Sequence, residues 1–81
     1  MSNLTLQEVG LADPAIQEAL LCIQGYTMSI ANKAVLSRFG GHYVMRSGDH
    51  RVTLPEFETT IEQLIDAWRS FRLTALLRNA T

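Results

Sequence analysis

The sequence predicts an α+β fold that is mostly helical: two long antiparallel helices joined by a β-hairpin, with a short N-terminal helix laid across them. Two runs of apolar residues at helical spacing, over residues 13–39 and 54–78, indicate the helices. Strand-forming residues on both sides of a Gly-Asp pair, over 42–54, indicate the hairpin. If the middle segment is an irregular loop, the alternative is an all-α helical hairpin. The length supports a single domain, residues 1–81.

The first long helix is predicted from its start signal and its apolar stripe. Asp13 is suited to the N-cap and Pro14 to the first helical position, and Gly40 marks the expected end. Gly25 lies inside the segment and is expected to cost up to about 1 kcal/mol relative to alanine. The stripe consists of Ile16, Leu20, Ile23, Thr27, Ile30 and Ala34.

The N-terminal segment is predicted to form only a short helix. Thr5 and Glu8 have capping-box spacing, and Gly10 is a suitable stop. Leu4 and Leu6 alternate with polar residues, so a short strand remains the alternative here.

The second long helix is predicted to begin at a capping box formed by Thr53 and Glu56. Acidic residues fill its first half and arginines its second half, as the helix dipole favours. Its apolar stripe steps alternately by four and three residues through Phe57, Ile61, Leu64, Trp68, Phe71 and Ala75. This helix is suited to packing against another element.

Two registers are compatible with the hairpin. A two-residue loop of Gly48 and Asp49 sets Arg46 opposite Arg51, and these like charges repel. A three-residue loop pairs Arg46 with His50 instead. We favour the three-residue loop because it avoids the facing arginines.

A homodimer is predicted because a chain of 81 residues buries little surface and Cys22, the only cysteine, cannot form an intrachain disulfide. Hydrophobic residues make up 47% of the chain and charged residues 19%, which supplies apolar surface for association. The two helical pairs would then share a four-helix core. Its candidate residues are Ile16, Leu20, Ile23, Ile30, Phe57, Ile61, Leu64, Trp68 and Phe71.

The sequence contains no arrangement of residues typical of an enzyme. His42 and His50 lack a third metal ligand at a usual spacing, and Cys22 lies in an apolar setting that keeps a thiol inert. No serine elbow or glycine-rich phosphate loop occurs. We therefore expect no catalytic residues, no metal and no cofactor.

The predicted function is protein interaction: a small adaptor, regulator or inhibitor of bacterial or phage type that acts as a homodimer. The alternative is nucleic-acid binding through the basic hairpin, which a net charge of −1 disfavours. Under either function the candidate surface consists of Arg38, His42, Tyr43, Arg46, His50 and Arg51.

A cytoplasmic protein without membrane contact is expected. Residues 1–10 lack the basic start of a secretory signal. The most apolar run, residues 19–23, is too short to cross a bilayer.

Overall fold

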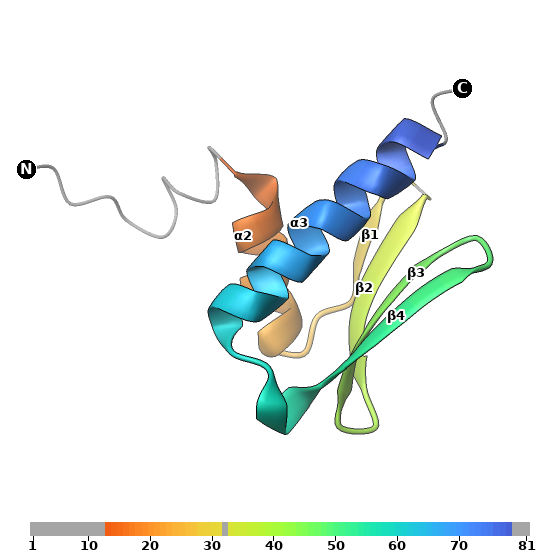
Figure 1. Cartoon of the computed structure of the whole chain (residues 1–81). Coiled ribbons are helices and arrows are strands. Elements are labelled where there is room, and N and C mark those ends of the chain that lie inside the picture. The colour runs from red at the N-terminus through yellow and green to blue at the C-terminus, as the bar shows by residue number, and fades with distance from the viewer. Residues whose placement is uncertain (1–12, 32, 79–81) are drawn as a thin grey trace, which may run out of the picture.

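The computed structural model describes residues 13–31 and 33–78, which form two layers (Figure 1). One layer is an antiparallel sheet with strand order β1-β2-β3-β4. The other layer consists of helices α2 and α3, which pack on one face of the sheet. The elements are α2 (Pro14–Ile23), β1 (Met28–Ile30), β2 (Ala34–Phe39), β3 (His42–Ser47), β4 (His50–Pro55), a 3-10 helix (Glu56–Glu58) and α3 (Ile61–Arg78).

The expected fold of two long helices around a hairpin is wrong, because the helix predicted over 13–39 ends at Ile23. The Asp13 carboxylate accepts a hydrogen bond from the Ala15 amide (3.1 Å), so the predicted N-cap is correct. The remaining residues of the predicted helix form β1 and β2 with their turns. The predicted N-terminal helix lies outside the described residues.

Gly25 ends α2. Its φ of +106° is left-handed backbone, and its amide donates to the Cys22 carbonyl (2.9 Å). The Tyr26 amide donates to the Leu21 carbonyl (3.1 Å). These two bonds form the Schellman motif, a common helix end that favours glycine at this position.

The residues after Gly25 alternate between two faces, as strands do. Met28, Ile30, Ala34 and Leu36 point to the helix layer, with Ile30 paired to Ala34 across the first turn. Two residues four apart in the sequence lie on the same face of a helix, and Ile30 and Ala34 also lie on the same face of this hairpin. The apparent helical stripe through Ile30 and Ala34 is therefore also compatible with strands.

Two-residue loops connect the last three strands. Gly40 (φ +62°) and Gly41 (φ +78°) form the β2–β3 turn, and both positive values fit a type I′ turn. Gly48 (φ +60°) and Asp49 form the β3–β4 turn.

The three-residue loop favoured for the β3–β4 hairpin is wrong. Ser47 pairs with His50, and Arg46 lies opposite Arg51. A glycine at the first loop position suits the tight primed turn, and this geometry outweighs the repulsion between two exposed arginines.

The second long helix begins at Ile61 and not at residue 54. Its start is a reciprocal capping box. The Gln63 amide donates to the Thr60 hydroxyl (3.1 Å), and the Thr60 amide donates to the Gln63 side chain (2.9 Å). Thr53, at the predicted start, is an exposed residue of β4.

The hydrophobic core lies between the helix layer and the sheet. The Trp68 side chain is fully buried and stacks on Phe71, with ring centroids 6.0 Å apart. Helix α2 contributes only small fully buried side chains, which leave room for the indole of α3. The core cluster contains Ala15, Ala19, Cys22, Ala34, Leu36, Tyr43, Met45, Leu64, Trp68, Phe71 and Ala75.

Glu18 of α2 joins the two helices from within the layer. Its Oε1 accepts a hydrogen bond from the Trp68 indole N–H (2.8 Å) and lies 2.9 Å from Nε of Arg72. The Arg72 Nε has no well-aligned hydrogen-bond partner, so this contact is an ion pair. Both charged side chains are largely shielded from water.

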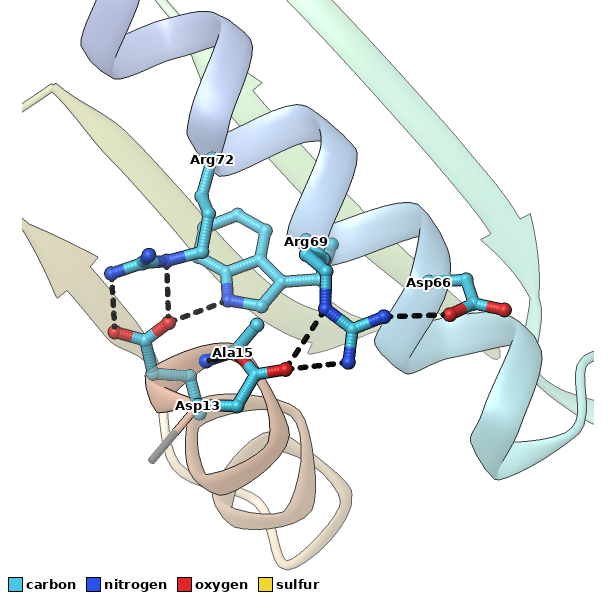
Figure 2. Close-up of polar contacts among 7 residues, drawn as sticks. Asp13, Ala15, Asp66, Arg69 and Arg72 are labelled. Carbon is cyan, nitrogen blue, oxygen red and sulfur yellow. Dashed lines mark hydrogen bonds and ion pairs between the residues drawn. The ribbon is translucent and has the colours of Figure 1, made fainter. Parts of the chain in front are cut away.

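A second polar link holds the start of α2 against α3 (Figure 2). Arg69 donates from Nε (2.9 Å) and Nη2 (2.6 Å) to Oδ2 of Asp13. Its Nη1 donates to Asp66 (2.9 Å) on the same helix. Asp13 thus caps α2 and also ties it to α3.

Candidate functional site

The sheet divides the six residues of the predicted basic surface into two groups. Side chains alternate between the faces of each strand, so adjacent positions in this cluster cannot share a surface. Three of the six face the helix layer: Arg38, Tyr43 and His50. The other three, His42, Arg46 and Arg51, lie on the opposite face, which no described helix covers.

Arg38 acts within the fold. Its Nη1 donates to the carbonyl of Ile23 (2.8 Å) at the end of α2 and lies 3.2 Å from Oε1 of Glu56. A cation at this position satisfies a free carbonyl and complements the helix dipole.

Tyr43 and His50 also contact the helix layer. Tyr43 is buried, and this burial raises the pKa of its hydroxyl above 10.0. The imidazole of His50 stacks on Phe71, with centroids 5.4 Å apart and ring planes 9° apart. Tyr43 therefore belongs to the core, whereas His50 is an exposed residue that contacts α3 on the helix side of the sheet.

The uncovered side of the sheet, which we call the open face, has two arginines at its centre. Arg46 of β3 and Arg51 of β4 are directly opposite each other. Their register position is a non-hydrogen-bonded pair, in which Cα atoms lie only about 4.5 Å apart. Among the described residues, neither arginine has an ion pair or a hydrogen bond from its side chain. No described strand residue on this face is acidic.

An apolar floor lies beside the arginines. Val44 is only 6% exposed although no helix covers it, and Val35 of the adjoining strand is half-buried. Phe39 is 79% exposed and lies opposite His42. The open face therefore combines exposed cations with an apolar surface.

Two shallow hollows of about 390 and 340 Å³ occupy the open face. Phe39, Val44 and Arg51 line both, so the hollows form one continuous surface. The first is also lined by Thr27, Val35, Ser37, Arg38 and Arg46, and the second by Gly40, His42 and Thr53. A partner of extended shape fits this surface better than a small enclosed ligand.

Sequence reasoning missed half of this face because it placed β2 inside a helix. The missed residues of β2 are Val35, Ser37 and Phe39. The available signal was the Gly40-Gly41 pair between two runs of strand-forming residues, which is typical of a tight hairpin turn.

The residues expected to form a dimer core have several different environments. Leu64, Trp68 and Phe71 belong to the core within one chain. Phe57 is 95% exposed and Ile61 53% exposed. The remaining four are half-buried: Ile16, Leu20, Ile23 and Ile30.

Other chemistry is limited over residues 13–31 and 33–78. No cluster of three metal-ligating side chains occurs there. Burial raises the pKa of the Cys22 thiol to about 11, against which the charge of Arg38 acts more weakly. The thiol is therefore held in its unreactive protonated form. None of the described helices is long and apolar enough to cross a membrane.

Comparison of the chain with protein-family models, with curated proteins and with solved structures finds no match.

Proposed function

We propose that this protein is a small, non-enzymatic protein-interaction module whose binding surface is the open face of the sheet. The observation that carries the proposal is the Arg46–Arg51 pair above an apolar floor, with no ion-pair partner among residues 13–31 and 33–78. Like charges opposite each other on a sheet are destabilising, so this pair lowers the stability of the free protein. A partner that presents carboxylates would remove this repulsion on binding.

The partner is a different protein and not a second copy meeting face to face. In a two-fold symmetric contact the same patch occurs on both sides. Such a contact would bring four arginines together without an acidic residue from either open face. A heterologous partner with an acidic surface fits the charge better.

Single-stranded nucleic acid is the second candidate. The exposed Phe39 beside His42 is a flat surface on which bases can stack, and the nearby arginines suit phosphates. Among the described residues of this face, Phe39 is the only large aromatic side chain that is strongly exposed, and the chain has a net charge of −1. These features favour the protein partner.

A capture experiment separates the two candidates. The full chain is used as bait in a lysate of its native host, with and without nuclease, and bound proteins are identified by mass spectrometry. The test variant is R46Q/R51Q. The control Q17E/Q24E changes exposed residues of α2 and its cap and lowers the net charge by the same amount.

We expect acidic proteins that resist nuclease, that are lost with R46Q/R51Q and that are retained with Q17E/Q24E. Loss of all bound material on nuclease treatment would instead assign the face to nucleic acid. Equal loss with both variants would show that net charge, and not this face, drives capture.

Two further expectations belong to the proposal. Homodimerisation stays a prediction, and exposed apolar side chains of α3, Leu73 and Leu77, offer a surface for it away from the arginines. The cytoplasmic location also stays a prediction.

A further inference from the structure

Strand β4 forms an outer edge of the sheet (Figure 1). Ser47 and His50 flank the two-residue loop and form a hydrogen-bonded pair, after which bonded and non-bonded pairs alternate. The backbone N–H and C=O groups of Arg51 and Thr53 therefore point away from β3. No described backbone group is bonded to them from outside the sheet. Pro55, which has no N–H, ends this edge.

The helix side of the same edge is incompletely filled. Helix α3 packs on β2 and β3, while Val52 and Leu54 of β4 stay half-buried. A hollow of about 240 Å³ lies there between β4 and α3. It is lined by Met45, His50, Val52, Ala67, Ser70, Phe71 and Thr74.

The other side of the edge carries positive charge that no described acidic residue neutralises. The Arg51 side chain lies on the open face next to Arg46. A strand added beside β4 would place a side chain close to Arg51 on that face. The same strand would direct its alternate side chains towards the hollow beside Val52.

We propose that β4 pairs with an extended segment of the partner protein whose acidic and apolar side chains alternate. This inference rests on the proposed function, and it specifies how the partner binds. The acidic side chains of this segment face Arg46 and Arg51, and its apolar side chains enter the hollow. Its backbone forms hydrogen bonds with the outward N–H and C=O groups of Arg51 and Thr53.

A second copy of β4 does not fit this description. Residues 50–55 contain histidine and arginine and no acidic residue, so pairing two β4 strands leaves the arginines uncompensated. Exposed edge strands of single domains are often protected by charge, and Arg51 has this effect on self-pairing. A segment with acidic residues turns the same charge into an attraction.

The test uses the full chain, nuclear magnetic resonance and a synthetic peptide in which glutamate and valine alternate. We expect the amide protons of Arg51 and Thr53 to exchange more slowly with solvent when the peptide is bound. The variant T53P removes one outward N–H and should weaken binding about fivefold. The control T53V keeps that N–H and a β-branched side chain, so it should bind like the wild type. A peptide alternating lysine and valine should not bind.

Several results would overturn the inference. In one such result the glutamate–valine peptide binds without slowing the exchange of the Arg51 and Thr53 amide protons, and T53P binds it as tightly as T53V does. The open face would then bind an acidic ligand without strand addition, and the proposed function would survive. If the peptide does not bind while capture of acidic proteins still depends on Arg46 and Arg51, strand addition is also wrong and the proposed function again survives. Slow exchange of both amides without peptide would show pairing between two copies. Tighter binding of oligothymidylate than of the peptide would assign the surface to nucleic acid.

Discussion

Glu18 is the residue on which the packing of the two helices most depends. Its carboxylate accepts a hydrogen bond from the Trp68 indole and forms an ion pair with Arg72. The Trp68 side chain is fully buried, and the two charged side chains are largely buried. Removing Glu18 leaves a buried donor and a shielded cation without partners. This loss costs more than the net free energy of the interactions themselves.

We expect E18A to lower the free energy of unfolding by about 2–4 kcal/mol. E18Q keeps an acceptor for the indole and should cost about 1–2 kcal/mol. Q17A, at the neighbouring exposed position, should change stability by less than about 0.5 kcal/mol. Urea unfolding followed by Trp68 fluorescence measures all three, and equal stability of E18A and Q17A would show that the Glu18 network contributes nothing.

Ala31 is the one described residue other than glycine with positive φ (+49°). It lies in the β1–β2 turn, where the Lys33 amide donates to the Ile30 carbonyl (2.7 Å). The left-handed region is costly for alanine and free for glycine. A31G should therefore raise the free energy of unfolding by about 0.5–1 kcal/mol despite the greater entropy of its unfolded chain. A lower midpoint of denaturation for A31G than for wild type would contradict this conformation.

The Cys22 thiol makes stability depend on pH in alkaline solution. Its folded pKa of about 11 lies above the ordinary value of 9.0, so the unfolded chain loses this proton first. The contribution is fully present below pH 9 and is lost as pH rises to 11, with a slope of at most about 1.4 kcal/mol per pH unit. C22A should flatten this part of the profile in chemical denaturation. The raised pKa of Tyr43 acts in the same direction and remains in the variant.

At the scale of elements, two pairs of residues have capping-box spacing before α3: Thr53 with Glu56, and Thr60 with Gln63. Thr60 and Gln63 form the real capping box, whereas Thr53 belongs to β4. T60A should cost about 1 kcal/mol of stability, because it removes the hydroxyl that accepts from the first turn. T53A, on an exposed strand position, should cost less. Circular dichroism during thermal unfolding measures both, and the reverse order would return the helix start to residue 53.

The start of α2 was predicted correctly, whereas the end of α2, the start of α3 and the β3–β4 register were predicted wrongly. Asp13 and Pro14 marked the start of α2, because capping acts within three residues. Gly25 was placed inside the long helix although it ends α2. The β1–β2 region could not be assigned from spacing alone, because its apolar residues satisfy a helical stripe and a strand pair equally well. Half of the open face was missed for this reason.

At the scale of the whole molecule, the two faces of the sheet have opposite roles. The helix-facing side holds the core, and the open face holds Arg46 and Arg51, which have no side-chain partner within the described part of the chain. This division could not be read from the sequence, since the basic residues appear as one cluster until the strand register assigns each to a face. The register therefore determines which of these residues are available for binding.

Homodimerisation is tested by the mass of the whole molecule. Leu73 and Leu77 lie one turn apart on α3 and are 57% and 61% exposed. We expect a dimer mass by light scattering at micromolar concentration and a monomer mass for L73E/L77E. A monomer mass for the wild type would contradict the dimer and leave the heterologous partner unaffected.

The most direct test of the open face as a binding site measures stability and binding in the same variant, R46E. This change replaces repulsion by attraction to Arg51, so the free energy of unfolding should rise by about 0.2–1 kcal/mol. Binding of the acidic partner should be lost, because the proposed site would now hold a negative charge. Higher stability together with lost binding is the result expected when a residue serves function at a cost in stability. A variant that is less stable than wild type and still binds would show that Arg46 serves the fold, and it would contradict the account.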